Sequence, residues 1–439
     1  MSLGEDTASD RAKRLAGEVG DAVRPVAAAA RDQVIPPGQD DPARIVLFRR
    51  VLLSPSRGSR RRTTIRRMSA APDEAAAAAG VGDAAEVDAF AARIFQQVLD
   101  GMEALAVYVG DRLGLYRVLA SGDALSIDEF ARRTGMHPRY AREWLEQQAV
   151  SGILTAQDDG DVVRFRLPGA HAEVLADERS LAYTSPAARM LVAAASRLPE
   201  LLEAYRGGGG VSWEQFGADA RDAQGDMNRP WFERALGAAL AGVPAVHEVL
   251  SRAGARLADV GCGHGWSTIA LARAYPGAEV LGVDVDAPSL QAARLHAAGM
   301  PAVSFRLAAG EDLADLAGTR QNGRLDAAFI FEALHDMPDP VGVLRAIRDA
   351  VKDDGVVVVM DEAVADRFAP DGDEIDRIMY AYSLFICLPD SMSTPESVAT
   401  GTVMRPATLD AYARAAGFSG TEVLPIDGFA AFRFYRLLV

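Results

Sequence analysis

The chain has 439 residues, of which 49% are hydrophobic and 24% charged, so it can bury two or three domain cores and is not disordered throughout. No run of about 18 apolar residues occurs, which argues against a membrane-spanning helix. The formal charge of −15 argues against a general affinity for nucleic acid or anionic membranes. The two cysteines, Cys262 and Cys387, are too few for a disulfide scaffold or a cysteine-rich zinc site. They fit a reducing compartment, so we expect a cytoplasmic protein.

Residues 1–80 are expected to form a disordered extension. They carry 14 Lys and Arg against 10 Asp and Glu, include alanine tracts, and lack clear apolar periodicity. The arginine-rich run Ser56–Arg62 is interpreted as a solvated tail rather than a nucleic-acid site. A start of translation at Met68 is an alternative that the sequence leaves open.

Residues 81–180 are predicted to form a mostly helical winged-helix domain. An apolar stripe at helical spacing runs from Val87 to Val109, and a capping-box pattern at Ser126–Glu129 begins a short helix. A turn at Thr134–Pro138 leads to a second helix, and alternating segments around Asp158–Gly160 predict a hairpin. Helix, turn, helix and hairpin in this order are typical of a winged helix.

The expected second helix of this domain is close to neutral. It carries Arg139 and Arg142 but also Glu143 and Glu146. A helix that reads DNA needs a basic face. We therefore expect the domain to cover a substrate site and to pair two chains as a homodimer through Glu86–Leu119, rather than to bind nucleic acid.

Residues 181–250 are predicted to be a helical connector that is interrupted at Gly207–Gly210. The connector concentrates aromatic and sulfur-containing side chains. Packing between domains is the simplest interpretation of such residues. Ligand cavities are also mainly apolar and often lie at domain junctions. We therefore expect the connector to line a substrate cavity, with Trp231 and Phe232 as substrate contacts.

Residues 251–439 alternate strands and helices. The expected strands are 256–260, 279–284, 303–307, 325–331 and 356–360, and the expected helices are 266–275, 288–298 and 340–351. This alternation is typical of an open, mostly parallel α/β sheet. The end differs, because residues 418–424 and 429–437 flank the turn Pro425–Gly428 and predict a closing antiparallel hairpin.

The segment Leu257–Gly265 carries the strongest chemical pattern. It reads Leu-Ala-Asp-Val-Gly-Cys-Gly-His-Gly, where an expected strand ends and a helix begins. Glycines there allow a tight turn and a close approach of a ligand to the backbone. The third glycine comes one residue too early for a dinucleotide fingerprint, which disfavours a nicotinamide oxidoreductase. The next strand ends at Asp284, 19 residues after Gly265, where a carboxylate can bind both hydroxyls of a ribose.

These motifs resemble the first motif and the following acidic motif of class I S-adenosylmethionine-dependent methyltransferases. With the winged helix before them, they resemble the small-molecule O-methyltransferases, and residues from about 85 to 439 resemble a bacterial winged-helix subfamily whose substrates are mostly unassigned. The matching stretches are Gly208–Trp213, Asp226–Pro230, Gly261–Trp266, Leu334–Pro340 and Arg414–Phe418. The resemblance implies an α/β fold with a seven-stranded Rossmann-like sheet at residues 251–439, and S-adenosylmethionine as cofactor. It also implies methyl transfer to a small, mostly apolar acceptor, by default at a hydroxyl oxygen, with nitrogen or carbon as alternatives.

The resemblance further implies which residues bind the cofactor. Asp259 would lie beneath its methionine portion, and Asp284 would bind its ribose. The other implied contacts are Gly261, Gly263, Gly265, Val285, Ala309, Gly310, Phe331 and Glu332. Ala309 stands where many relatives have an aspartate that bonds the adenine amino group. Adenine recognition is therefore expected from backbone groups around Ala309 and Gly310 or from Glu311.

His335 is the candidate general base for a hydroxyl acceptor, because the unperturbed pKa of histidine lies near neutrality and Asp336 follows it. A structural role is the alternative, since the corresponding His-Asp pair of plant O-methyltransferases is mainly structural. Those enzymes have their catalytic histidine after the fifth strand, and this chain has no histidine after His335. Tyr382, on a predicted apolar helix near the cofactor, is a candidate substrate contact. The histidines show no metal-ligand spacing, so no metal is expected.

Two alternatives to an active enzyme stay open. One is a transcriptional regulator, in which the winged helix binds DNA and the sheet senses S-adenosylmethionine. The other is a catalytically inactive protein that binds S-adenosylmethionine, which the empty position after the fifth strand permits. The sequence does not identify the acceptor molecule.

Overall fold

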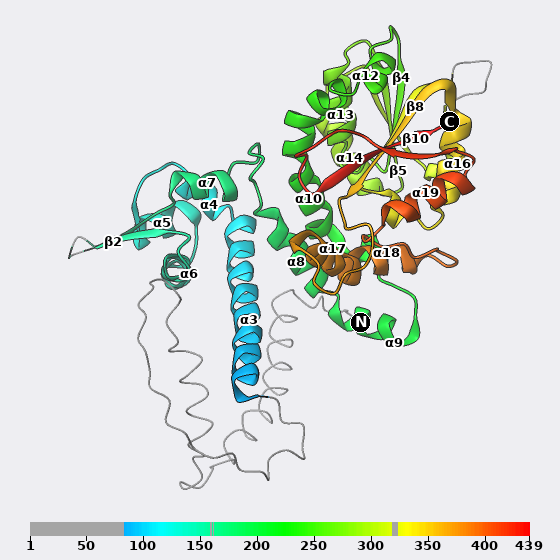
Figure 1. Ribbon diagram of the computed structural model, residues 1–439. Coiled ribbons are helices and arrows are strands. Elements are labelled where there is room, and N and C mark those ends of the chain that lie inside the picture. Colours follow the sequence, from blue (N-terminus) through cyan, green and yellow to red (C-terminus); the bar gives the residue numbers. More distant parts are fainter. Residues whose placement is uncertain (1–82, 159, 161, 318–323) are drawn as a thin grey trace, which may run out of the picture. The chain divides into compact units, whose positions relative to one another are not determined.

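The computed structural model describes residues 83–158, 160, 162–317 and 324–439. The expected disordered extension and Met68 lie outside the described residues. The chain divides into two compact units, residues 1–98 and 99–439. Helix α3 (Ala84–Arg112), blue in Figure 1, begins in the first unit and ends in the second. Within the described ranges, no helix combines the length and the apolar character needed to cross a membrane.

The predicted order of helix, turn, helix and hairpin is confirmed. Its elements are α4 (Leu115–Leu119), β1 (Leu125–Ser126), α5 (Ile127–Thr134), α6 (Pro138–Val150), β2 (Thr155–Asp158), β3 (Val163–Arg166) and the following α7 (Gly169–Leu175), with the strands in the antiparallel order β1-β3-β2. The capping box is present as predicted, since Ser126 N donates to the Glu129 carboxylate at 2.8 Å and Glu129 N donates to Ser126 Oγ at 3.3 Å. Buried Tyr116, Phe130 and Trp144 form the centre of this core.

The connector is helical, as predicted. Its elements are α8 (Pro186–Ala195), α9 (Leu198–Gly207), α10 (Trp213–Trp231), the π-helical turn η1 (Phe232–Leu236), α11 (Gly237–Ala241) and α12 (Pro244–Leu250). The interruption after α9 is a close approach of two backbones, because a Cβ atom on Gly210 would lie 1.8 Å from the carbonyl oxygen of Pro389. Val211 N donates to the same oxygen at 3.0 Å. This contact joins the start of α10 to a segment almost 180 residues further along the chain.

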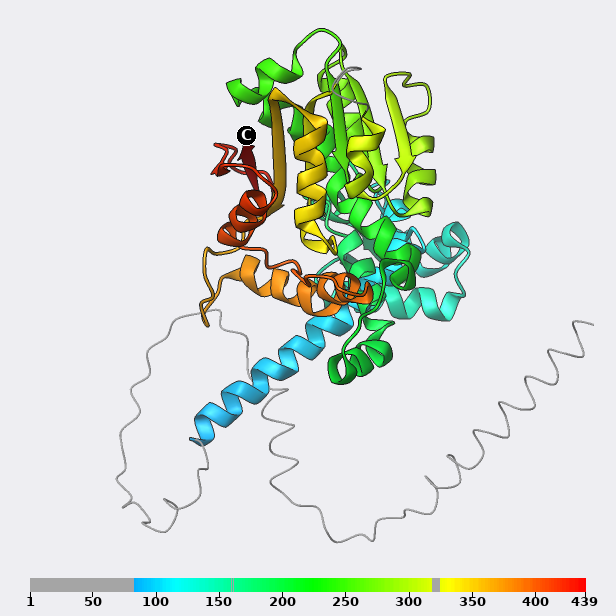
Figure 2. The same ribbon diagram turned by 90° about the vertical axis from the view of Figure 1, so that its right-hand side faces the viewer.

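The described residues of the C-terminal part form a seven-stranded sheet in the order β6-β5-β4-β7-β8-β10-β9. Its strands are β4 (Arg256–Val260), β5 (Glu279–Asp284), β6 (Val303–Leu307), β7 (Leu325–Phe331), β8 (Val351–Glu362), β9 (Gly420–Val423) and β10 (Phe432–Leu438). The first five run parallel, and β10 is antiparallel to both of its neighbours. The predicted parallel sheet and closing hairpin are therefore confirmed (Figures 1 and 2).

Helices and short helical turns accompany this sheet. They are α13 (Trp266–Ala274), α14 (Ala287–His296), η2 (Gly310–Asp312), α15 (Leu313–Leu316), η3 (Leu334–Asp336), α16 (Pro340–Ala350), α17 (Glu374–Tyr382), η4 (Ser383–Cys387), α18 (Leu388–Ser393) and α19 (Pro406–Ala415). Each central strand contributes alternate side chains to two apolar cores. On β7, Phe329 belongs to the core with α13, and Ile330 belongs to the core with α16. Central parallel strands are thus buried on both faces, and ligands bind at the edge where their carboxyl ends meet.

Candidate active site

A cavity of about 820 Å³ lies where β4, β5 and β7 end. Its volume is within the range of roughly 300–1,000 Å³ that small-molecule sites occupy. We call the lining contributed by the loops after β4, β5 and β6 the loop wall, which comprises Gly261, Gly263, Asp284, Val285, Ala309 and Gly310. We call the lining contributed by helices the helix wall, which comprises Met190, Trp213, Asn228, Phe232, Tyr382, Ile386 and Cys387. Phe331 and Glu332, at the end of β7, also line the cavity.

The three glycines that follow β4 have positive φ angles, a backbone conformation that favours glycine. The angles are +76° at Gly261, +47° at Gly263 and +76° at Gly265. A Cβ atom on Gly261 would lie 2.6 Å from Ala333, whereas one on Gly263 would have no described neighbour within 4 Å. Gly263 therefore leaves the loop open to the cavity. Gly265 packs against Phe305 and is not among the residues that line the cavity, so its cofactor contact stays a prediction.

Asp259 also stands apart from the cavity. Its side chain is fully buried, and its Oδ2 accepts hydrogen bonds of 2.6 Å from Ser267 and Thr268, near the start of α13. Burial raises the pKa of Asp259 to about 6, against the opposing effect of these hydroxyls. Asp259 shares the strand face of Leu257, which packs in the core with α13, and its cofactor contact stays a prediction. Asp259 stabilises the helix that follows the glycine loop.

Asp284 fits a sugar diol. Its Oδ2 accepts from Gly263 N and its Oδ1 from Asp286 N, both at 2.8 Å. A carboxylate offers about four lone-pair sites, so two remain for hydroxyl donors in the cavity. Burial raises the pKa of Asp284, and the backbone hydrogen bonds oppose this shift. The loop wall thus offers an open backbone and a desolvated acceptor side by side, which suits the nucleoside portion of S-adenosylmethionine.

Glu332 is a strained residue directly after β7. Its φ is +53°, although it is not a glycine. Its Oε2 accepts a hydrogen bond of 2.6 Å from Asn228 Nδ2 on α10. Burial raises the pKa of Glu332 to about 7, while the hydrogen bonds from Asn228 and Gln224 favour the ionised form. A carboxylate with such a pKa can accept a proton near neutral pH.

His335 lines the cavity but is only 2% exposed. Its Nδ1 lies 3.0 Å from Asp361 Oδ1, and its Nε2 lies 3.4 Å from Asp336 Oδ1. Burial lowers the pKa of His335, but the carboxylates of Asp336, Glu362 and Asp361 outweigh this effect and raise the pKa well above its usual value. An imidazole that keeps its proton cannot accept a second one, which argues against a general base. The assignment of His335 as general base stays a prediction.

The helix wall contains two of the three expected substrate contacts. Phe232 and Tyr382 line the cavity. Trp231 does not, because its ring packs on Phe429 with the ring centroids 5.5 Å apart. The ring belongs to the packing around the sheet, and the substrate contact of Trp231 stays a prediction. Neighbouring residues of a helix point in different directions, so only one of this aromatic pair reaches the cavity.

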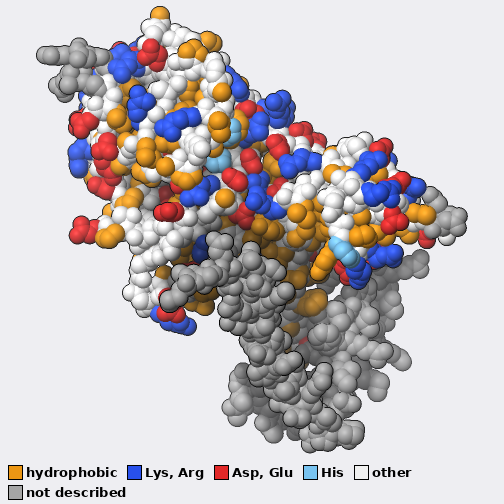
Figure 3. Space-filling view, turned by 180° about the vertical axis from the view of Figure 1, so that it is seen from behind, with side chains coloured by type: hydrophobic (Ala, Val, Ile, Leu, Met, Phe, Trp, Pro, Cys, Tyr) orange, Lys and Arg blue, Asp and Glu red, His pale blue; other side chains and the backbone are white. Residues whose placement is uncertain are grey.

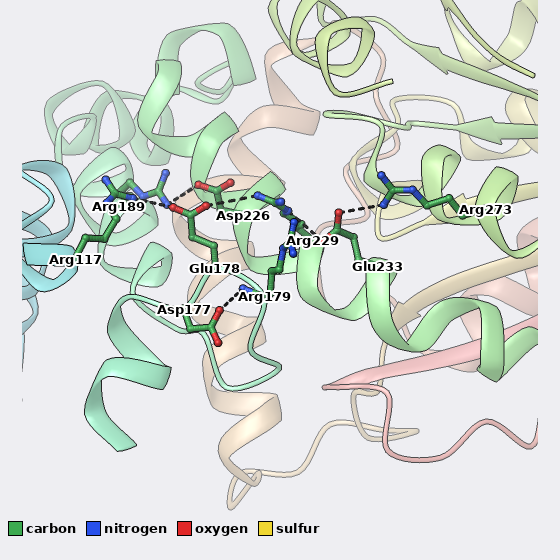
Figure 4. A network of polar contacts seen from close by, with 9 residues as sticks. All are labelled: Arg117, Asp177, Glu178, Arg179, Arg189, Asp226, Arg229, Glu233 and Arg273. Atoms are coloured by element: carbon green, nitrogen blue, oxygen red, sulfur yellow. Dashed lines mark hydrogen bonds and ion pairs between the residues drawn. The ribbon is translucent and has the colours of Figure 1, made fainter. Parts of the chain in front are cut away.

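Ion pairs fix the helix that carries Asn228 (Figure 4). Arg229 contacts Glu178 at 3.5 Å and Glu233 at 3.3 Å. Buried Arg189, on α8, contacts Asp226 at 2.7 Å. These contacts bind α10 to its neighbours on both sides of Asn228.

The sequence analysis missed Asn228 and Gln224 as site residues. Both lie on α10 and line the cavity beside Glu332. Asn228 stands in the stretch Asp226–Pro230, which already resembled the winged-helix subfamily. An asparagine between charged residues of an amphipathic helix was the available sign, because a polar amide is expensive to bury without a partner.

Two family models match parts of the chain. Residues 251–386 match the model of a methyltransferase domain, and residues 101–177 match the model of an Rv2258c-like winged HTH domain. The ubiquinone biosynthesis O-methyltransferase of Alkalilimnicola ehrlichii is 41% identical over 106 residues, which are 24% of this chain and 40% of that protein. The enzyme of the same name from Chromobacterium violaceum is 40% identical over 109 residues, 24% of this chain and 44% of that protein. The chain thus matches less than half the length of these curated relatives.

Solved structures resemble a larger share of the chain. Human N-acetylserotonin methyltransferase, in complex with S-adenosylmethionine, has a TM-score of 0.60 at 16% identity and covers 82% of this chain and 99% of its own. The mitomycin 7-O-methyltransferase MmcR has a TM-score of 0.56 at 19% identity and covers 81% and 99%. At these identities the likeness concerns the fold. The chain therefore contains one region that matches a methyltransferase domain and another that matches an Rv2258c-like winged HTH domain, and its fold is similar to that of these solved methyltransferases.

Proposed function

We propose that the protein transfers a methyl group from S-adenosylmethionine to a small, mostly apolar acceptor, at a hydroxyl oxygen. The observation that carries this proposal is one cavity that joins Asp284, with acceptor capacity left over, to Glu332, with a pKa near neutrality. The names of the matched relatives, ubiquinone biosynthesis O-methyltransferases, support oxygen as the methylated atom.

The loop wall is proposed to bind the donor. Asp284 would accept hydrogen bonds from the ribose hydroxyls, and the backbone of Gly261 and Gly263 would lie against the amino-acid portion. The remaining contacts would be Val285, Ala309, Gly310, Phe331 and Glu332. When bound, S-adenosylmethionine supplies a methyl group activated by a positively charged sulfur.

Glu332 is proposed to accept the proton of the acceptor hydroxyl. Asn228 donates a hydrogen bond to one carboxylate oxygen, which orients the group, and the other oxygen would accept the proton. The apolar side chains of Phe232 and Tyr382 would position the acceptor and exclude water. Alignment of reactants contributes up to about 7–11 kcal/mol, and a positioned base about 10²- to 10⁴-fold in rate. His335 is the alternative proton acceptor.

Transfer is tested with S-adenosylmethionine that carries a labelled methyl group, together with a panel of small phenols and quinols. We expect label in an acceptor whose mass rises by one methylene, and loss of transfer in Asp284→Ala. Binding of S-adenosylhomocysteine without transfer to any acceptor, in several preparations, would favour the inactive binding protein. Absence of both would contradict the proposed function.

A homodimer that pairs through α3 belongs to the same proposal. The side chains of Val87, Phe90, Val98 and Met102, which lie on this helix, are all more than half exposed. Apolar stripes of this size commonly mark interaction surfaces. The second part of the expected interface, Leu115–Leu119, is buried in the winged-helix core, so we restrict the proposal to α3. Light scattering should give twice the mass of one chain, and Phe90→Asp with Val98→Asp should give the monomer.

We propose that the winged helix does not bind nucleic acid. Arg139 and Arg142 each contact a glutamate of the same helix, Glu143 and Glu146. On the face shown in Figure 3, basic and acidic side chains are interspersed. The regulator alternative requires DNA affinity that falls steeply with salt, which fluorescence anisotropy at low salt would detect. Both cysteines of the described chain are free thiols, which supports our proposal of a cytoplasmic location.

A further inference from the structure

A cluster of nitrogen, oxygen and sulfur donors lies at one side of the cavity. His335 and Asp336 belong to η3, and Cys387 ends η4 about 50 residues later. One donor atom from each lies within 4.8 Å of the other two. All three residues line the cavity. Sequence spacing did not indicate a metal site because the fold, and not a local motif, brings these donors together.

The hydrogen bond of His335 to Asp361 shows which of the two ring nitrogens can bind a metal ion. A carboxylate only accepts, so Nδ1, 3.0 Å from Asp361 Oδ1, carries a hydrogen and donates it. The other nitrogen, Nε2, then faces Asp336 Oδ1 at 3.4 Å. Two lone pairs at this distance repel each other unless a proton or a metal ion lies between them. Histidines that bind metal characteristically donate their other N–H to a carboxylate, as His335 does to Asp361.

Two buried oxygen atoms lie at the same place. Asp336 Oδ1 makes no hydrogen bond by geometry and contacts His335 Nε2 at 3.4 Å, and Thr402 Oγ1 likewise makes no hydrogen bond by geometry among the described residues. Thr402 is 1% exposed and lines the same cavity. Buried polar atoms are normally satisfied, and unsatisfied ones call for an explanation such as an absent ion.

We propose that His335 Nε2, the Asp336 carboxylate and the Cys387 thiolate bind Zn²⁺, with a fourth position open to the cavity. Zinc takes nitrogen, oxygen and sulfur ligands in tetrahedral geometry. Bonds of about 2.0–2.2 Å in that geometry place nitrogen and oxygen ligands about 3.4 Å apart. This is the separation of His335 Nε2 and Asp336 Oδ1. Binding releases the proton of the Cys387 thiol, and the Nε2 proton where the imidazole is protonated, to solvent.

The neighbouring group of His335, Asp361 and Glu362 is the weaker candidate. Their donor atoms also lie within 4.8 Å of one another. However, it requires Nδ1 as the ligand, and Nδ1 already donates to Asp361. The open position of the proposed site faces the same cavity as Glu332. If the proposed function holds, the acceptor is a compound whose ionisable hydroxyl or thiol takes this position, since Zn²⁺ lowers the pKa of such a group.

Calorimetric titration of chelator-treated, full-length protein with Zn²⁺ tests the site. We expect one ion per chain and release of protons to the buffer. Asp361→Asn removes the partner of the bound histidine and should weaken affinity by about 10- to 100-fold. Cys387→Ser and Asp336→Asn remove ligands and should weaken it further. Glu362→Gln is the matched control, which removes a buried carboxylate of the weaker candidate and should weaken affinity less than any of these.

Cobalt provides a second readout that does not depend on the variants. Co²⁺ bound to the unmodified protein should show a thiolate-to-cobalt charge-transfer band, and iodoacetamide treatment of Cys387 should abolish it. The proposal is overturned if the unmodified protein does not bind Zn²⁺ stoichiometrically. It is also overturned if Glu362→Gln loses Zn²⁺ binding to the same extent as Cys387→Ser. Binding of S-adenosylhomocysteine is measured on the same samples. Binding of Zn²⁺ without binding of S-adenosylhomocysteine would contradict the proposed function but not the zinc site. Binding of S-adenosylhomocysteine without binding of Zn²⁺ would contradict the zinc site but not the proposed function.

Discussion

The two walls of the cavity are built in different ways. The residues of the loop wall from Gly261 to Val285 fall within one strand–helix–strand unit, and they present mainly backbone groups and one carboxylate to the cavity. The helix wall draws its side chains from positions as far apart as Met190 and Cys387. A local motif can therefore specify the loop wall, whereas the helix wall depends on packing between segments that are distant in the chain.

The walls also differ in how their carboxyl groups are satisfied. Both oxygens of Asp284 accept backbone hydrogen bonds, so its position follows from the loop itself. Glu332 is oriented by Asn228, a side chain on a helix whose own position depends on ion pairs. The first arrangement should tolerate changes elsewhere in the chain, and the second should not. The predictions below test this difference.

Asp284→Ala should have the largest effect, on cofactor affinity. It removes the acceptor of two hydroxyl donors, each hydrogen bond to a charged group contributing about 1.5–3 kcal/mol, so the Kd for S-adenosylhomocysteine should rise by about 10²- to 10⁴-fold. Calorimetry measures the change. Asp315→Ala, which alters an exposed aspartate on α15, is the control. An affinity close to that of the unmodified protein would remove Asp284 from the site.

Arg189→Leu should strongly destabilise the fold. Arg189 is 5% exposed and pairs with Asp111 at 2.9 Å and Asp226 at 2.7 Å. Its removal leaves the Asp111 carboxylate, whose side chain is 9% exposed, and the half-buried Asp226 carboxylate without their cationic partner, which should cost about 3–5 kcal/mol in the free energy of unfolding. Urea denaturation measures this loss. The control is Arg206→Leu, whose partner Glu203 is exposed, and whose loss should cost at most about 1 kcal/mol. Equal effects of the two changes would refute a special role for the buried pairs.

Glu332→Gln should lower kcat by about 10²-fold or more, because it removes the proposed proton acceptor. The active form of Glu332 is the carboxylate, and its pKa is about 7, so the rate should fall as the pH drops below 7. The glutamine variant should lose this limb of the pH profile. Glu311→Gln, at an exposed position of the cavity lining, should keep the fall in rate below pH 7. If Glu332→Gln keeps the fall in rate below pH 7, another group accepts the proton, and His335 is the next candidate.

The smallest effect is expected from a pair of glycine substitutions. Gly263→Ala adds only the strain of a left-handed backbone, about 1–2 kcal/mol, because its Cβ atom meets open space. Gly261→Ala has a similar φ penalty and also collides with Ala333. Urea denaturation should therefore show a larger loss for Gly261→Ala. Equal losses would mean that the loop relaxes around the added methyl group.

The parts that the sequence predicted correctly are those with local patterns. The alternation of strands and helices, the capping box at Ser126 and the cavity-lining positions Gly261, Gly263 and Asp284 follow from residues close to each other in the chain. Trp231, which packs on Phe429, shows the limit of composition, because composition indicates that an aromatic residue is buried but not which surface it meets.

Asp259 shows a related limit of the sequence. Proximity to the glycine loop does not tell on which face of β4 its side chain lies, and that face is covered by α13. Asn228 and the donor set around Cys387 arise from contacts between segments distant in the chain, which a single sequence does not display.

Parallel calorimetric titrations of the full-length protein with S-adenosylhomocysteine and with NAD test the central claim most directly. The claim is that the glycine loop and Asp284 form a site for the methyl donor and not for a dinucleotide. We predict one molecule of S-adenosylhomocysteine bound per chain and no binding of NAD. Binding of NAD, or heat from neither ligand in correctly folded protein, would contradict it.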